Sequence, residues 1–254
     1  MRLLAILSCS VFVCSGALIA SPVIDPSRSG LVQEEMRWQG WVPNGQVVEI
    51  NNVHGNVRAE AADGEQIEVI ALKRGLGDPQ QVSIQVVEHK GGITICAVYP
   101  SADPARPFDC RPSHGGGYRV ASDSGGETRI RWDNGGGGDM LLNDLRVDFI
   151  VRLPKRLRFI GRTVDGEISA HLLEEDVEAH SVRGDLHVDM TELRGADVHA
   201  ETADGEVRSE FPLALHYDPT HGVMAVGRVG HPRRTLRLQT AMGDIHLDRV
   251  VPVL

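Results

Sequence analysis

The sequence is poor in the side chains that often fill a hydrophobic core, because aromatic residues make up only 4% of its 254 residues. A core must therefore be built from Val, Ile, Leu and Ala, which suits narrow coils of β-strand. Basic residues are also few, since 26 Lys and Arg stand against 35 Asp and Glu, a net charge of −9. Nucleic acid is therefore not an expected partner, because clustered cations bind its backbone.

Recognisable catalytic motifs are missing as well. The chain contains no Gly-x-Ser-x-Gly, no His-Glu-x-x-His and no Cys in a nucleophile motif. No cofactor is expected, and carboxylates are too frequent in an acidic chain to single out a catalytic pair. The sequence predicts a protein that is not an enzyme. One alternative stays open, a β-helical enzyme that acts on polysaccharides through clustered aspartates.

The N-terminus has the pattern of a secretory signal peptide. Residues 1–20 carry one charge, Arg2, then the apolar run Leu3 to Val13, then small residues. The run is too short to span a bilayer, and no later stretch approaches the roughly 18 apolar residues that a transmembrane helix needs. We expect cleavage after Ala20 or Ala17, no transmembrane segment in the mature chain, and a location in the periplasm or at the cell surface or outside the cell.

Two cysteines, Cys96 and Cys110, would remain after removal of residues 1–20. A disulfide between them is the preferred interpretation, because the exported compartment is oxidising. Closing a loop of that size would contribute about 3 kcal/mol in the chain-entropy model. Two free thiols are the alternative. A zinc site lacks further ligands at suitable spacing, and no Cys-x-x-Cys pair is present.

One short phrase recurs four times in the C-terminal half of the chain. Aligned on a glycine, the copies are Arg162-Thr-Val-Asp-Gly166-Glu-Ile-Ser-Ala170, His180-Ser-Val-Arg-Gly184-Asp-Leu-His-Val188, Glu201-Thr-Ala-Asp-Gly205-Glu-Val-Arg-Ser209 and Gln239-Thr-Ala-Met-Gly243-Asp-Ile-His-Leu247. The glycines are 18, 21 and 38 residues apart, and the last interval is close to two periods of 19. Such a period is typical of a solenoid.

Each copy has apolar residues at alternate positions, as in a strand with one buried face, but the alternation slips by one residue at the glycine. A slip sends side chains to the opposite face unless the backbone bends there, so each glycine is predicted to lie at a bend. A fifth copy surrounds Gly55, at an offset of 111 residues from the copy at Gly166. A unit of about 19 residues cannot bury its apolar face alone, so the copies are predicted to stack.

These glycine repeats, the segment Cys96-Ala-Val-Tyr-Pro100 and the closing Leu236–Leu247 resemble a bacterial family of unknown function known as putative adhesins with β-strand repeats. The resemblance covers roughly residues 38–254. It implies an all-β, right-handed β-solenoid-like fold in an exported protein, and it supplies no catalytic residues.

The remaining segments complete the expected domain organisation. Residues 21–37 are polar and read as a flexible leader, and residues 38–254 as the β-repeat domain. Residues 82–87 and 93–98 are predicted to form a hairpin. Residues 111–139 hold nine glycines and are expected to form a flexible excursion. Residues 211–235 interrupt the period and are expected to form a loop and one degraded coil.

Stacked copies would align their outward side chains in columns. The position after the glycine is occupied by Asn56, Glu167, Asp185, Glu206 and Asp244. Such acids could bind calcium, or they could simply face water beside neighbouring cations, which is the preferred interpretation. His180, His187 and His246 also point outward, where isolated surface histidines are favoured over a metal site or a pH switch. The Thr and Ser residues three positions before the glycines are expected to face inward and satisfy backbone groups.

The sequence therefore predicts an exported, non-enzymatic β-repeat protein. It would act as an adhesin-like module or an envelope scaffold through an extended repetitive surface, with a protein or glycan of the cell envelope as partner. The alternatives are the polysaccharide-acting enzyme and a calcium-stabilised binding module.

Overall fold

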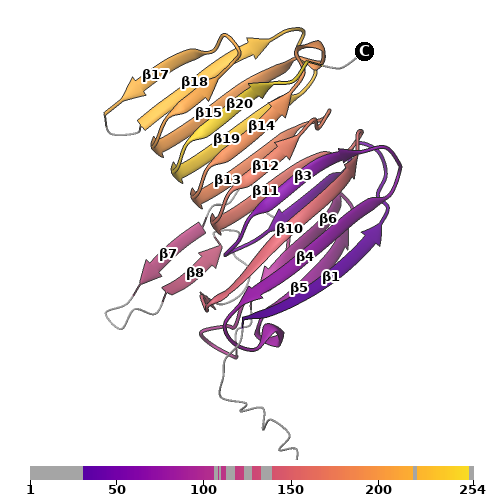
Figure 1. The fold of residues 1–254 in the computed structure, drawn as a ribbon, viewed down its shortest axis with the longest axis vertical. Coiled ribbons are helices and arrows are strands. Elements are labelled where there is room, and N and C mark those ends of the chain that lie inside the picture. Colours follow the sequence, from indigo (N-terminus) through magenta and orange to yellow (C-terminus); the bar gives the residue numbers. More distant parts are fainter. Residues whose placement is uncertain are drawn as a thin grey trace, which may run out of the picture.

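The computed structural model describes residues 31–105, 108, 110–112, 118–122, 128–132, 139–219 and 222–251. The expected signal peptide with its cleavage sites at Ala17 and Ala20, and residues 21–30 of the expected leader, lie outside these residues. The fold is all-β, and two mixed sheets face each other along the long axis of the molecule (Figure 1). The described part contains two short 3-10 turns, η1 (Pro79–Gln81) and η2 (Glu192–Arg194), and no helix long and apolar enough to cross a membrane.

The first sheet has eight strands. In spatial order they are β1 (Val32–Gly40), β4 (Ile67–Gly75), β10 (Leu145–Pro154), β3 (Val57–Ala62), β12 (Ile168–His171), β14 (Leu186–Met190), β20 (Ile245–Arg249) and β16 (Val207–Ser209). Pairing is antiparallel from β1 to β10 and parallel from β10 to β16.

The second sheet has nine strands. In spatial order they are β17 (Ala214–Asp218), β18 (Gly222–Val229), β15 (Ala196–Asp204), β19 (Thr235–Met242), β13 (Val177–Arg183), β11 (Arg158–Asp165), β2 (Val47–Asn51), β6 (Gly92–Val98) and β5 (Ser83–His89). The hairpin expected at residues 82–98 is confirmed, because β5 and β6 pair antiparallel. At the other end β17 and β18 form a second antiparallel hairpin against β15.

The five repeat copies form five rungs, each consisting of a strand of the second sheet, the repeat glycine and a strand of the first sheet. The predicted register is confirmed at the offset of 111, because Phe159 pairs with Val48 and Ile168 pairs with Val57. The apolar positions of both strands point between the sheets. There they are buried, as in Val48, Phe159, Val177, Leu236 and Val198 of the second sheet and Val57, Ile168, Leu186, Ile245 and Val207 of the first.

The expected continuous solenoid is wrong in two respects. The sheets do not form a closed solenoid, because antiparallel strands flank the parallel rungs at both ends. The rungs also do not follow the order of the sequence, since β19 lies between β13 and β15, so the copy at Gly243 stacks between those at Gly184 and Gly205. Residues 211–235 supply no degraded coil, because β17 and β18 pair antiparallel outside β15.

The first sheet also begins earlier than expected. Residues 32–37, assigned to the flexible leader by their polarity, belong to β1 and pair antiparallel with β4. The apolar alternation is hidden in the sequence because Glu34 occupies a position on the half-buried face, where its carboxylate accepts a hydrogen bond from Lys73 Nζ at 2.7 Å. Lys73 is itself buried, so the ion pair stabilises the edge of the sheet where an apolar pair would otherwise be expected.

The glycine-rich excursion at residues 111–139 contains strands rather than loop alone. Within it, β7 (Tyr118–Ser122) pairs antiparallel with β8 (Thr128–Trp132), and β8 pairs antiparallel with β9 (Met140–Leu141), which directly follows the excursion. This small sheet projects from the side of the stack (Figure 1). Residues 113–117, 123–127 and 133–138 lie outside the described part of the chain.

The repeat glycines mark the edge where the chain crosses from the second sheet to the first, which we call the glycine edge. A Cβ atom added at each glycine would collide with a carbonyl oxygen of the neighbouring rung or, at Gly55, of the neighbouring strand β10. The distances would be 2.0 Å from Gly55 to Val147 O, 2.0 Å from Gly166 to Gly55 O, 2.0 Å from Gly184 to Gly166 O, 2.3 Å from Gly243 to Gly184 O and 2.1 Å from Gly205 to Gly243 O. Close approach between rungs is therefore a stronger reason for glycine than the bend alone.

Replacing Gly184 by Ala should reduce the free energy of unfolding by about 2–4 kcal/mol, because it combines overpacking with an unfavourable backbone conformation at φ +145°. Urea unfolding of the chain measures the change. Gly64→Ala is the matched control, since a Cβ there meets nothing within 4 Å, and it should change stability by less than about 0.5 kcal/mol. Equal effects at the two positions would contradict the rung contact.

Candidate functional site

Side-chain hydroxyls inside the glycine edge connect each rung to the next. The residue three positions before the repeat glycine donates its hydroxyl proton to the glycine carbonyl of the neighbouring rung. The donor and acceptor pairs are Thr163 to Gly55 at 3.0 Å, Ser181 to Gly166 at 3.0 Å, Thr240 to Gly184 at 2.9 Å and Thr202 to Gly243 at 2.8 Å. All four hydroxyl residues are buried. The predicted inward column of Thr and Ser is confirmed, and its role is structural.

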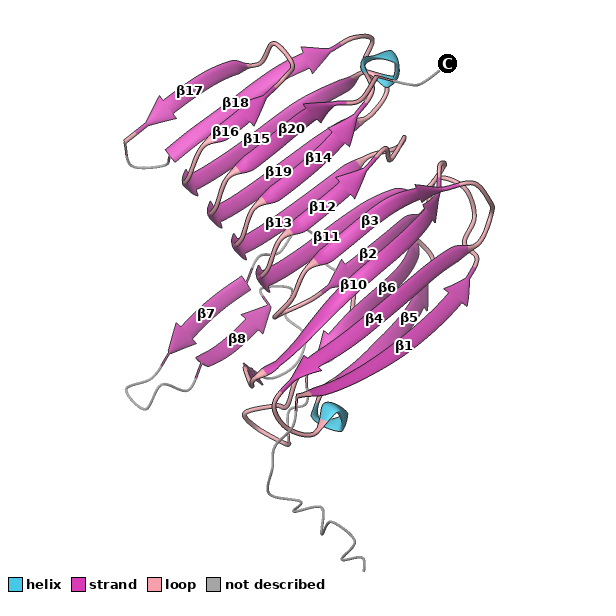
Figure 2. Cartoon of the chain, in the orientation of Figure 1, coloured by secondary structure: helices cyan, strands magenta, loops and turns pink. Residues whose placement is uncertain are grey.

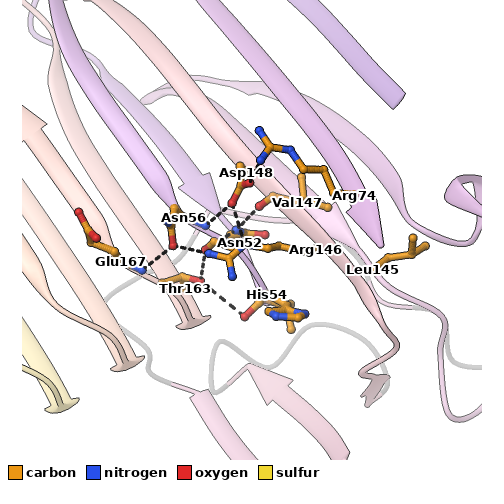
Figure 3. A network of polar contacts seen from close by, with 12 residues as sticks. Asn52, His54, Asn56, Arg74, Leu145, Arg146, Val147, Asp148, Thr163 and Glu167 are labelled. Atoms are coloured by element: carbon orange, nitrogen blue, oxygen red, sulfur yellow. Dashed lines mark hydrogen bonds and ion pairs between the residues drawn. The ribbon is translucent and has the colours of Figure 1, made fainter. Parts of the chain in front are cut away.

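The first rung uses an amide in place of a hydroxyl. Asn52, also three positions before its glycine, donates from Nδ2 to Val147 O at 2.8 Å and to Gly55 O at 2.9 Å. Figure 3 shows this start of the ladder with Thr163 on the next rung. Strand β10 therefore provides the carbonyl that a preceding rung would supply.

The column after the glycines has a related role. Oδ1 of an Asn or Asp accepts a hydrogen bond from the backbone N–H of the next residue in the column. The pairs are Asp148 with Asn56 at 2.9 Å, Asn56 with Glu167 at 2.9 Å (Figure 3), Asp185 with Asp244 at 2.8 Å and Asp244 with Glu206 at 2.9 Å. Within the described residues, no group of three or more His, Cys, Asp or Glu is arranged to hold a metal ion. The column therefore acts as a set of backbone acceptors.

The outward histidines do not gather into one site. His187 and His246 occupy equivalent positions on β14 and β20, and their rings stack with centroids 4.6 Å apart. His180 lies on β13, where its Nε2 is 2.9 Å from Oε1 of Glu178. Stacking of two rings is a consequence of the parallel register and gives two ligands at most, which is too few for a protein metal site.

A buried charged cluster lies on the outer face of the second sheet and was not predicted from the sequence. Arg162, 2% exposed, lies between Glu49 and Glu178, and its Nε is 3.8 Å from Oε1 of Glu49. Thr94 donates a hydrogen bond to Glu49 at 3.0 Å. Alternation places all of these side chains outward, where a sequence pattern suggests exposure. Pairing across β2, β11 and β13 could have been suspected only from the opposite charges on adjacent rungs.

Cys96 and Cys110 lie at disulfide distance, with their Sγ atoms 1.97 Å apart. Cys96 is on the outer face of β6, and Cys110 belongs to the segment that leads into the small third sheet. Both are buried. A bond there fastens the start of the excursion to the second sheet, and its formation in the exported protein stays a prediction.

The opposite ends of the strands form a second edge, which we call the loop edge. It is made of the turns that return from the first sheet to the second and the adjoining turns, and Figure 2 draws its loops in pink and η2 in cyan. Three cavities of about 400, 470 and 600 Å³ adjoin one another here and share Lys155. The exposed apolar side chains at this edge are Trp41 at 63%, Leu172 at 42% and Leu193 at 84%.

Charged groups surround the middle cavity of the loop edge. Lys155 Nζ lies 3.2 Å from Asp63 Oδ1, and Arg194 Nη2 lies 2.5 Å from Glu174 Oε2. Arg234 also lines this cavity and donates from Nη1 to the carbonyl of Leu173. Apolar, cationic and anionic groups thus meet in one concave surface. Such a surface can bind a ligand by combining burial with directed polar contacts.

Replacing Thr240 by Val should lower the free energy of unfolding by about 1–2 kcal/mol, because the shape is kept while the Gly184 carbonyl loses its buried donor. Thr235→Val on the same strand is the control, since Thr235 is exposed, and it should change stability by less than about 0.5 kcal/mol. Thermal or urea unfolding decides between them. Two equal losses would remove the hydroxyl ladder as a source of stability.

The stability of the buried cluster should depend on pH through Glu178. The hydrogen bond from His180, with the nearby charge of Arg162, holds the pKa of Glu178 below its ordinary value despite the opposing effect of burial. A lowered pKa means that this contribution is present above pH about 4.5 and is lost as pH falls through the folded-state pKa.

Glu178→Gln should therefore destabilise the protein above pH about 4.5, and the difference from the unmodified chain should shrink as the pH falls toward 3. Urea unfolding across this range measures the difference. Glu88→Gln, at an exposed glutamate, controls for the loss of one negative charge. A constant difference at all pH values would show that Glu178 stabilises the sheet by packing alone.

Comparison with known proteins adds little to this geometry. No family model and no curated protein matches the chain. Among solved structures, a putative cell adhesion protein from Clostridium sporogenes is similar over 85% of this chain and 100% of its own, with 11% identity and a TM-score of 0.46. A putative adhesin from Bacteroides fragilis is similar over 84% of this chain and 97% of its own, with 11% identity and a TM-score of 0.24. Likeness at this level carries no functional argument.

Proposed function

We propose that the chain is an exported, non-enzymatic binding module, adhesin-like or a scaffold of the cell envelope, that binds a protein or glycan at its loop edge. One observation carries the proposal. Three adjoining cavities open along this edge beside exposed Trp41, Leu172 and Leu193, whereas the glycine edge uses its polar groups in hydrogen bonds between rungs. Exposed aromatic and aliphatic side chains in a concave, charged surface are typical of binding sites.

Export is part of the same proposal and rests on two features. Residues 1–20 have the charge, apolar run and small residues of a signal peptide. The approach of Cys96 and Cys110 to disulfide distance fits an oxidising compartment, where such bonds persist. Both features support a place in the periplasm, at the cell surface or outside the cell.

A second candidate is an enzyme that acts on acidic or neutral polysaccharides, and one observation favours it. Three carboxylates, those of Glu60, Asp63 and Glu174, line the same cavity. Each of them is within ion-pairing distance of a cation, namely Arg58, Lys155 and Arg194 respectively. Carboxylates held by cations are suited to orienting a ligand, and a general acid needs a carboxylic acid that keeps its proton. Binding is therefore the function that the geometry supports best.

The test is binding of the chain without residues 1–20 to a glycan array and to isolated cell envelopes. A double variant, Trp41→Ala with Leu193→Ala, should weaken binding at least about tenfold, which corresponds to about 1.4 kcal/mol. Tyr217→Ala is the control, because Tyr217 is 78% exposed on β17 and lines none of the three cavities.

Unchanged binding by the double variant would remove the loop edge as the site. Release of new reducing ends from a bound polysaccharide would support the enzyme instead. Both assays use the same protein preparation, so that a failure to fold, seen in the unfolding curve, cannot be mistaken for a failure to bind.

A further inference from the structure

The middle cavity of the loop edge has a buried cation at its wall. It occupies about 470 Å³ between the turn that follows β3, the return from β12 to β13, the 3-10 turn η2 and the loop that precedes β19. Arg234 enters from the last of these and is only 5% exposed. The loop is held close to η2, since a Cβ at Gly195 would lie 2.4 Å from His231 O and one at Gly230 would lie 2.7 Å from Glu192 O. Arg234 is thus fixed in place by its own backbone.

The guanidinium of Arg234 has no directly paired carboxylate among the described residues. Among the described residues, no carboxylate oxygen lies within 4.0 Å of it, its Nε has no hydrogen-bond partner, and Nη1 donates to the carbonyl of Leu173. Glu174, which lines the same cavity, is engaged with Arg194 at 2.5 Å. Burial, together with the nearby charge of Arg194, lowers the pKa of Arg234 from its ordinary value against the opposing charges of Glu174, Glu175 and Asp176. A buried guanidinium with an unpaired Nε and a carbonyl as its hydrogen-bond acceptor is only partly compensated, so an anion that enters the cavity would be bound favourably.

The cavity also exposes apolar surface beside this cation. Leu172 is 42% exposed and has a positive φ of 54°, a strained conformation for a residue other than glycine. Leu193, on η2, is 84% exposed. Both line the cavity. Strained backbone conformations of this kind cluster at ligand-binding and other functional sites.

We propose that this cavity binds a monocarboxylate with an aliphatic group, whose carboxylate pairs with Arg234 and whose aliphatic part lies against Leu172 and Leu193. The inference deepens the proposed function by naming the chemistry that the loop edge recognises, and it rests on that function. Arginine is suited to the role because its planar guanidinium can hold both oxygens of a carboxylate.

The other charged groups of the cavity are already paired with one another. Glu60, Asp63 and Glu174 line the same cavity and are paired with Arg58, Lys155 and Arg194, so Arg234 is the group that a ligand carboxylate would meet. An inorganic phosphate or sulfate has no aliphatic part to lie against Leu172 and Leu193. A monocarboxylate places one charge at Arg234 and presents no other to these carboxylates. A neutral aliphatic ligand would leave Arg234 without a directly paired carboxylate. The affinities for inorganic phosphate and for a neutral aliphatic ligand can both be measured.

The first experiment uses the unmodified chain without residues 1–20 and calorimetric titration with three probes: octanoate, octanamide and inorganic phosphate. Octanoate should bind at least about tenfold more tightly than either other probe and should raise the melting temperature. A short peptide that ends in Leu with a free carboxylate is a fourth probe, and its amidated form is the control. Tighter binding of octanoate or of the peptide then identifies the source of the aliphatic carboxylate. Equal binding of octanoate and octanamide, or no binding of either carboxylate, would overturn the proposal.

The second experiment removes the charge. Arg234→Met should lower the affinity for octanoate at least about tenfold and leave the melting temperature of the ligand-free protein unchanged or higher, because a charge without a directly paired carboxylate is replaced by an apolar chain. Arg233→Met, at the exposed neighbouring residue, should retain octanoate affinity. A large loss of ligand-free stability in Arg234→Met, with octanoate affinity retained in the folded fraction, would make Arg234 a structural residue and overturn the proposal.

The outcome is separable from that of the proposed function. Octanoate binding that depends on Arg234, without binding to glycans or cell envelopes, would retain this inference and remove the adhesin-like role. Envelope binding that depends on Trp41 and Leu193, with no affinity for any carboxylate probe, would do the reverse.

Discussion

The structure depends on the close contact between the glycine of one rung and the glycine carbonyl of the next. In this contact there is no room for a Cβ, because the nearest carbonyl oxygen would lie 2.0 to 2.3 Å away in all five rungs. The carbonyl is at the same time the acceptor for the Thr, Ser or Asn side chain three residues before the next glycine. Glycine, which has no side chain, lets the backbones of neighbouring rungs approach closely. The Thr, Ser or Asn side chain then donates a hydrogen bond to the carbonyl that this approach buries, so the carbonyl is not left unpaired.

These contacts make the glycine edge regular and leave the loop edge irregular. On the glycine edge each rung crosses from sheet to sheet at its glycine, and the polar groups there are used internally, by Thr, Ser or Asn side chains inside and by Asn and Asp oxygens outside. On the loop edge the returns have no such constraint: residues 172–176 form an irregular turn with a strained Leu172, while η2 occupies the equivalent place one return later. Cavities and exposed apolar side chains accumulate where the repeat does not dictate the backbone, as is common for functional loops on a rigid scaffold.

The pairing register of the strands can be predicted from the sequence, but the order in which the rungs stack cannot. Each inward position is apolar and each glycine is preceded by Thr, Ser or Asn at the same distance, so alignment of the copies predicts which residues pair, as Phe159 with Val48 confirms. Equivalence of the copies is also why the order was wrong, because any rung can stack on any other and nothing local forbids β19 from lying between β13 and β15. The contacts that build the candidate site were beyond prediction for another reason. Arg234 reaches the carbonyl of Leu173 across 61 residues of sequence, and neither position belongs to the repeated phrase.

Two buried arginines show how structural and functional charge differ in one fold. Arg162, 2% exposed, lies between Glu49 and Glu178 on adjacent strands, so its charge is balanced by the sheet that carries it. Arg234, 5% exposed, has a backbone carbonyl for a partner and faces a cavity rather than a strand. A carbonyl dipole offsets only part of the free energy needed to bury a full charge, whereas a paired carboxylate offsets more of it. The balancing groups for Arg162 are therefore on adjacent strands, whereas Arg234 has no directly paired carboxylate and lines a cavity in which the proposed ligand carboxylate could pair with it.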